Sequence, residues 1–223
     1  MSKWRYLSYP LSAETPAYGG GDSFQTCSGK SIQAGDSCNT SVWKLSNHSG
    51  THIDFPKHFA KDGKTGDKYP PGFWIFNHPK LVDLSTVPPG YIIGTADLEK
   101  ARLGLDMDLL LVKTGFCYLR SEPLYWQENP GLNPDLAGFF RESCPSLRVI
   151  GSDFISLSSF VHRDLGRKAH SAFLDHPLPL LPLEDVNLSF VDAETRFKEV
   201  IISPLVVAQS DAAPCTVFAK IEE

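Results

Sequence analysis

Short apolar runs separated by polar residues recur along the 223-residue chain. β-Branched and aromatic residues dominate these runs, and glycine, proline or charged residues bound them, which is typical of strands. The runs that predict strands span residues 4–9, 41–45, 79–83, 109–113, 147–150, 178–183, 200–202 and 216–221. The pattern therefore predicts more strands than helices.

Helical patterns are fewer. Asn133, Pro134 and Asp135 have the order of an N-cap followed by proline at the first helical position, which predicts a helix over residues 136–142. Apolar residues recur at helical spacing over residues 163–174, and Pro177 ends that pattern. A weaker pattern covers residues 95–103. Strands interspersed with a few helices predict one α/β or α+β domain over residues 1–223.

Composition excludes several classes of protein. Hydrophobic residues make up 42% of the chain, charged residues 21%, and the net charge is −5, which indicates a folded, soluble protein. Without a cluster of lysine and arginine, neither nucleic acid nor an anionic membrane is an expected partner. No apolar run reaches the roughly 18 residues of a membrane span, and the first residues lack the apolar core of a secretion signal. We expect a cytoplasmic protein.

The cysteines agree with a reducing compartment. Their number is odd and no two have CxxC spacing, so neither a disulfide framework nor a cysteine-rich zinc site is expected. All five are therefore predicted to be buried free thiols; they are Cys27, Cys38, Cys117, Cys144 and Cys215.

The segment 47–59 concentrates residues that bind metals. His48, His52, Asp54 and His58 lie at offsets 0, 4, 6 and 10, and even offsets put side chains on one side of a strand. A straight strand would separate His48 and His52 by about 13 Å, so the chain must bend at Gly50. Two imidazoles and a carboxylate then suit a divalent metal. The alternative is a set of surface or structural histidines.

Three further polar residues stand out. Glu184 ends the apolar run 178–183, and a buried glutamate there needs a partner or a metal; a solvated turn glutamate beside Asp185 is the alternative. Asp153 follows Gly151 and could orient a ligand histidine. His78 has no ligand-type neighbour and is predicted to be structural.

The motif His48-Ser49-Gly50-Thr51-His52-Ile53-Asp54-Phe55-Pro56-Lys57-His58 resembles the signature of the metal-dependent cyclase-type hydrolases, which include bacterial kynurenine formamidases and isatin hydrolases. The resemblance extends to residues 7–11, 15–18, 109–115, 129–132 and 149–153. It implies a mixed, barrel-like sheet flanked by helices, of the swivelling β/β/α type. In that family the first two histidines and the aspartate bind metal, and the last histidine carries protons, which is the role it implies for His58.

The resemblance also implies a second metal, held by a histidine on a distal helix and a glutamate after the next strand. The best matches are His170 and Glu184. The spacing between them differs from the family pattern, which leaves His162 and His176 as alternatives to His170. Two divalent ions are thus expected; zinc is favoured, manganese is the alternative, and iron also suits such ligands.

The implied activity is hydrolysis of an aryl formamide such as N-formylkynurenine, a reaction of tryptophan catabolism, or of a cyclic amide such as isatin. Tyr18 falls where an aromatic residue contacts the substrate, and the long loop 60–73, with Tyr69 and Phe73, is predicted to form a wall of the site. Lactone hydrolysis or dehydration at the same metals is an alternative. A non-catalytic metal or small-molecule binding protein is another, which an uncoordinated His58 disfavours. The family suggests a homodimer or homotetramer.

Overall fold

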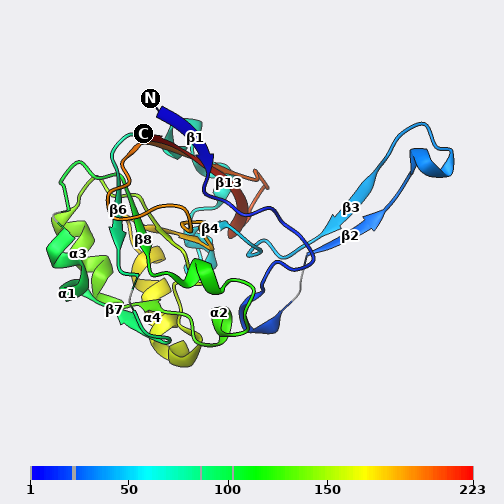
Figure 1. Ribbon diagram of the computed structural model, residues 1–223. Helices are drawn as coiled ribbons and strands as arrows, with labels where there is room; N and C mark the ends of the chain where they lie inside the picture. The colour runs from blue at the N-terminus through cyan, green and yellow to red at the C-terminus, as the bar shows by residue number, and fades with distance from the viewer. Residues whose placement is uncertain (1, 22–23, 86, 102, 223) are drawn as a thin grey trace.

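Figure 1 shows a computed structural model, which describes residues 2–21, 24–85, 87–101 and 103–222. The strands are β1 Ser2–Tyr6, β2 Gln25–Ser28, β3 Ser41–Lys44, β4 His52–Asp54, β5 Ile75–Phe76, β6 Pro79–Asp83, β7 Ile92–Ile93, β8 Leu109–Lys113, β9 Gly131–Leu132, β10 Val149–Ser152, β11 Leu181–Glu184, β12 Phe197–Pro204 and β13 Ala212–Glu222. The α-helices are α1 Thr95–Leu98, α2 Leu124–Gln127, α3 Asp135–Ser143 and α4 Arg163–Leu174.

One mixed sheet organises the fold. Its strand order is β5-β12-β13-β4-β11-β10-β8-β6, and β1 also pairs with β13. Strands β6, β8, β10 and β11 are parallel to one another, whereas β4, β13, β12 and β5 add to the sheet in antiparallel fashion. Strands β6 and β12 lie against each other although they are far apart in the order, so the sheet nearly closes. The predicted single α/β domain with a barrel-like sheet is confirmed.

Strand β8 shows how the sheet separates two cores. Leu109 and Leu111 point into the barrel, where they pack in one cluster with Ile53 of β4. Leu110 and Val112 pack in the other cluster, with residues of α3 and α4. Because successive side chains of a strand point to opposite faces, a strand covered on both faces is apolar throughout. This arrangement explains the uninterrupted apolar run that predicted β8.

Most predicted elements form, several at the predicted bounds. Strands β6 and β8 and helix α4 coincide with their predictions. At the start of α3, the Asn133 side chain accepts a 2.9 Å hydrogen bond from the Asp135 N–H, and Pro134 already has helical φ and ψ, so the predicted cap is present. The predicted helix 95–103 is shorter: α1 ends at Leu98 and a 3₁₀ turn continues over Glu99–Ala101, and residue 102 lies outside the described residues.

A hairpin of β2 and β3 extends away from the body (Figure 1). All of its paired residues are exposed, including Val42 and Trp43, so it has no core of its own. Cys27 and Cys38 are exposed in this region, which corrects the prediction that all five thiols are buried. Among the residues that the structure describes, no helix combines the length and the apolar character required to cross a membrane.

Candidate metal centre

Strand β4 places His52 and Asp54 of the motif at the middle of the sheet, between β13 and β11. His52 and Asp54 alternate along the strand, so both side chains point to the same side, and both are buried. The predicted bend is confirmed, because Gly50 has φ +62°, a conformation that side chains disfavour. The bend turns His48 back, and its Nδ1 lies 3.0 Å from Oδ1 of Asp54.

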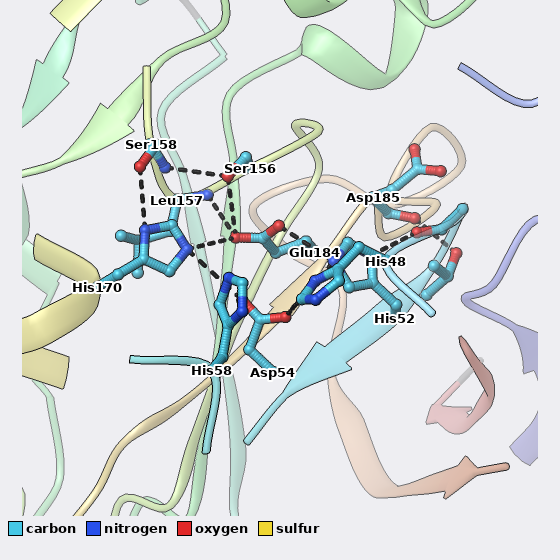
Figure 2. A network of polar contacts seen from close by, with 12 residues as sticks. His48, His52, Asp54, His58, Ser156, Leu157, Ser158, His170, Glu184 and Asp185 are labelled. Carbon is cyan, nitrogen blue, oxygen red and sulfur yellow. Dashed lines mark hydrogen bonds and ion pairs between the residues drawn. The ribbon is translucent and has the colours of Figure 1, made fainter. Parts of the chain in front are cut away.

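Two elements far along the chain complete the cluster (Figure 2). Glu184 ends β11 directly opposite His52 in the sheet register, and its Oε2 lies 3.3 Å from Nε2 of His52. His170 comes from α4, and its Nε2 lies 3.5 Å from Oδ2 of Asp54 and 3.5 Å from Oε1 of Glu184. The alternative of a solvated Glu184 is excluded, since its side chain is buried.

Unsatisfied atoms in this cluster test whether a metal fits. Nε2 of His52 and both carboxylate oxygens of Asp54 are buried and form no hydrogen bond. Buried polar atoms without partners cost free energy, and native proteins seldom keep several together without a ligand. Imidazole nitrogens and carboxylate oxygens are the donors that zinc and related divalent ions bind. The residues therefore fit a divalent metal.

The far side of each ligand residue is anchored. Nδ1 of His52 lies 2.8 Å from the Gly50 carbonyl, and Nδ1 of His170 lies 3.1 Å from the Gly166 carbonyl, so each ring presents Nε2 to the cluster. Oε1 of Glu184 accepts a 2.6 Å hydrogen bond from the Leu157 N–H. Such outer contacts orient metal ligands and fix the histidine tautomer.

The charges of the cluster favour a cation. Burial lowers the pKa of His170, but the negative charges of Asp54 and Glu184 beside its ring outweigh burial and raise it to about 10. The pKa of His52 rises to about 9 for the same reasons, with Glu184 as its main partner. Burial raises the pKa of Glu184, whereas the histidines lower it to about 2. The two carboxylates therefore stabilise positive charge here, which a divalent cation would supply without protons on the imidazoles.

His58 lies at the edge of the cluster. It ends the 3₁₀ turn Pro56–His58 that follows β4, and its ring centroid lies 4.3 Å from that of His48 and 5.8 Å from that of His170. Burial lowers the pKa of His58, which leaves its ring neutral and able to accept a proton near pH 7. One ring nitrogen of His58 also lies within 4.8 Å of a donor atom of His48 and of Asp54, so the geometry allows His58 to bind a metal as well.

Asp211, just before β13, was not predicted from the sequence. Its Oδ2 lies 3.2 Å from Nε2 of His48 and 3.2 Å from Nδ1 of His58, and its Oδ1 accepts a 2.7 Å hydrogen bond from Asn47. One carboxylate thus orients two motif histidines. Nothing in the sequence around Asp211 indicates this contact, which depends on the pairing of β13 with β4.

Asp185 is a second buried carboxylate. The solvated-turn alternative for Glu184 would have left Asp185 exposed beside it. It is buried instead, and Arg120 binds both of its oxygens at 2.8 and 2.6 Å. Its carbonyl accepts a 2.6 Å hydrogen bond from the Thr51 hydroxyl. Because Thr51 precedes β4 and Asp185 follows β11, these contacts lock together the two strands that carry His52 and Glu184.

The other histidines lie elsewhere. His162 and His176 are exposed, and the His176 ring accepts a hydrogen bond from the Leu178 N–H. Of the three candidates for the distal metal ligand, only His170 lies in the cluster. His78 is exposed beside Asp106. The prediction for Asp153 is wrong: its carboxylate accepts hydrogen bonds from Thr114 and Gly115 and holds the turn after β8 rather than a ligand histidine.

A cavity of about 440 Å³ opens onto the cluster. Tyr18 lines it, as predicted, and stands edge-on to Phe160 with ring centroids 5.5 Å apart. The predicted wall from loop 60–73 is wrong, because Tyr69 packs against Phe55 and Phe73 and no residue of this loop lines the cavity. The remaining described lining residues are Ala17, Gly21, Ser46, His48, Ser49, His52, Asp54, His58, Phe59, Ile155, Ser156, Ser158, Arg163, Arg167, His170 and Glu184.

The conformation of Gly50 predicts that a larger residue at this position destabilises the protein. A Cβ at this position would lie 2.6 Å from Cδ2 of Leu11, and its φ of +62° is strained for any other residue. We expect Gly50→Ala to lower the free energy of unfolding by about 1–3 kcal/mol. Urea denaturation measures this, with Gly138→Ala as the control. Gly138 lies inside α3 with no atom near its added Cβ, so that variant should be neutral or more stable by up to about 1 kcal/mol. Equal effects of the two substitutions would contradict a strained bend.

Curated relatives match almost the whole chain. A kynurenine formamidase of Bacillus anthracis is 30% identical over 213 residues, which cover 96% of this chain and 95% of that protein. A kynurenine formamidase of Bacillus thuringiensis subsp. konkukian is 28% identical over 219 residues, with 98% of both chains covered. The relatives are thus hydrolases.

Solved structures show the same fold. Isatin hydrolase A from Labrenzia aggregata superposes with a TM-score of 0.84 at 19% identity, over 100% of this chain and 94% of the other. A protein described as a potential metal-dependent hydrolase with cyclase activity has a TM-score of 0.79 at 20% identity, with both chains fully covered. The sequence model described as "Putative cyclase" matches residues 6–159. The chain therefore belongs to the putative cyclase family.

Proposed function

We propose that this protein is a metal-dependent amidohydrolase that cleaves an aryl formamide such as N-formylkynurenine, or a related cyclic amide such as isatin. The observation that carries the proposal is the convergence of buried, unsatisfied donor atoms of His52 and Asp54 with those of Glu184, at the floor of the cavity. The full-length similarity to kynurenine formamidases supports the reaction class.

The donor atoms favour two divalent ions, with zinc preferred and manganese the alternative. The residues that would hold these ions are His48, His52, Asp54, His170 and Glu184. Divalent metals bound here would lower the pKa of water and polarise the substrate carbonyl.

The proposed role of His58 is to move protons. With Nδ1 held by Asp211, Nε2 carries the lone pair and can accept a proton from water. The hydroxide that remains bonds to the amide carbon, and the same His58 atom can return the proton to the nitrogen as the carbon–nitrogen bond breaks. The products are the arylamine and formic acid, which ionises to formate; a cyclic amide instead opens to a single product. Asp211 positions the ring throughout, and its charge stabilises the protonated imidazole.

A substrate screen separates this proposal from its alternatives. Metal-loaded protein would be assayed on formanilide, isatin and an aryl lactone, with metal content per chain measured in parallel. Cleavage of the amides supports the proposal. Preference for the lactone, or elimination of water from a hydroxylated substrate, supports the other reactions of the same site. Tight metal binding with no turnover of any substrate supports a binding protein.

Tyr18 carries a prediction about selectivity. Its ring lines the cavity beside Phe160, and stacking against an aryl substrate contributes about 0.5–1.5 kcal/mol. We expect Tyr18→Ala to lower kcat/KM for formanilide by about 3- to 10-fold and to change kcat/KM for N-formyl alkylamines little. Tyr118→Ala is the control, because Tyr118 is exposed and does not line the cavity. Equal losses on aryl and alkyl substrates would contradict an aryl-binding role.

We also propose a cytoplasmic homodimer or homotetramer that acts on a small molecule, without nucleic acid or membrane partners. The hairpin of β2 and β3 supports self-association, because Val42 and Trp43 stand exposed on an extension that lacks a core. Light scattering of the purified protein tests the oligomeric state.

A further inference from the structure

The wall of the cavity formed by α4 carries two arginines. Arg163 and Arg167 lie one helical turn apart, and His170 follows on the same face of the helix, so all three line the cavity. With a rise of 1.5 Å per residue, Arg167 lies about 4.5 Å and Arg163 about 10.5 Å along the axis from His170. The guanidinium groups therefore occupy the wall beyond the metal cluster, where the part of the substrate that does not react would lie.

Neither guanidinium is neutralised by a fixed partner. Arg163 forms no ion pair with any residue that the structure describes, and its guanidinium lies 5.2 Å from the centre of the Phe160 ring. Arg167 pairs with Asp164 three residues earlier on the helix, but both side chains are mostly exposed, and such surface pairs contribute little. Both charges thus remain available to a ligand.

The arginines adjoin the aromatic part of the cavity. Phe160 contacts Tyr18 and Trp126 edge-on, at centroid distances of 5.5 and 5.2 Å, and Arg163 lies over its ring. An aryl ring against Tyr18 would thus have the guanidinium groups beside its substituents.

The net charge of the cavity lining also favours binding of an anion. Asp54 and Glu184 are the acidic groups among its described lining residues, and both belong to the metal cluster. Two divalent cations there would more than neutralise them and leave the two arginines as additional positive charge. Arginine binds carboxylates through paired, charge-assisted hydrogen bonds.

We infer that Arg163 and Arg167 form a carboxylate-binding subsite, so that the preferred substrate is an aryl formamide that bears a carboxylate on a side chain of its ring. This inference rests on the proposed function and narrows its substrate class. The subsite fixes the orientation of the ring, because the formyl group must lie at the metal cluster while the carboxylate lies at the arginines of α4.

A matched pair of substrates tests the subsite. 3-(2-Formamidophenyl)propanoate and its primary amide, 3-(2-formamidophenyl)propanamide, differ in charge but hardly in shape. In metal-loaded protein we expect kcat/KM to be about 10- to 100-fold higher for the carboxylate, mainly through KM. Arg163→Gln and Arg167→Gln should each reduce that preference by about tenfold or less, and the double variant should abolish it while hydrolysis of the propanamide persists.

Lys168→Gln is the control, since Lys168 is an exposed cation of the same helix that does not line the cavity, and it should leave the preference intact. Equal hydrolysis of both substrates by the wild type would overturn the subsite and leave the amidohydrolase standing. A preference that survives the double substitution would also overturn it, because the carboxylate would then bind elsewhere, as at the metals.

If neither substrate is cleaved, the aryl formamidase part of the proposed function fails, and binding still decides the subsite. Calorimetry would compare 3-(2-aminophenyl)propanoate with its primary amide. Tighter binding of the carboxylate that disappears in the double variant supports the subsite without turnover, and equal binding of the two compounds overturns it.

Discussion

Replacing Glu184 by alanine is expected to deplete bound metal and to reduce the rate of hydrolysis by more than about 100-fold. Removing a residue that only orients a metal ligand typically costs about 10- to 100-fold, and removing the ligand itself should cost more. Glu184 faces His52 through one carboxylate oxygen and His170 through the other, so its removal affects both proposed metal positions. Elemental analysis of protein purified without chelators, together with the formanilide rate, measures the two effects.

His170→Ala sharpens this test. Nε2 of His170 lies near Oδ2 of Asp54 and Oε1 of Glu184, whereas His48 lies near the other Asp54 oxygen, Oδ1. We therefore expect it to lose mainly one of two metals. His162→Ala and His176→Ala are matched controls, because both rings are exposed outside the cluster. Full metal content in His170→Ala, with loss in either control, would show that the distal ligand is wrongly placed; full content in Glu184→Ala would contradict its role as a ligand.

The elements nearest the centre were the easiest to predict from the sequence. Strand β8 is buried on both faces and is therefore apolar over residues 109–112, and α4 combines helical spacing with a proline stop. The bend at Gly50 follows from geometry alone, because two histidines four residues apart on a straight strand cannot share an ion. The hairpin of β2 and β3 is exposed on both strands, which explains why apolar periodicity indicated only one of them.

Contacts between distant segments could not be predicted in this way. Asp211 reaches His48 and His58 because β13 pairs with β4, and no local pattern encodes that pairing. Asp185 resembles an ordinary turn residue until Arg120 is seen to bind it. Tyr69 and Phe73 follow the histidine motif closely, yet the chain carries them into the opposite core, so proximity in sequence gave a wrong wall for the cavity.

His58→Ala should retain the bound metals and lose about 10²- to 10⁴-fold in kcat, the usual contribution of general acid–base catalysis. The ring is bound through Nδ1 to Asp211, which leaves Nε2 free to carry the proton between water and the leaving nitrogen. Elemental analysis and the pH dependence of kcat together measure the effect. The wild type should need a neutral ring to accept a proton, so its activity should fall at low pH, and this limb should disappear in the variant.

His78→Ala is the control for that substitution, since its ring is exposed beside Asp106 and remote from the cavity lining. Asp211→Asn should give a smaller loss than His58→Ala, because the ring would remain in place without the charge that stabilises its protonated form. Loss of metal together with activity in His58→Ala would instead make His58 a ligand, as its position near His48 and Asp54 allows. Unchanged activity with full metal would remove His58 from the mechanism and leave water itself to carry the proton.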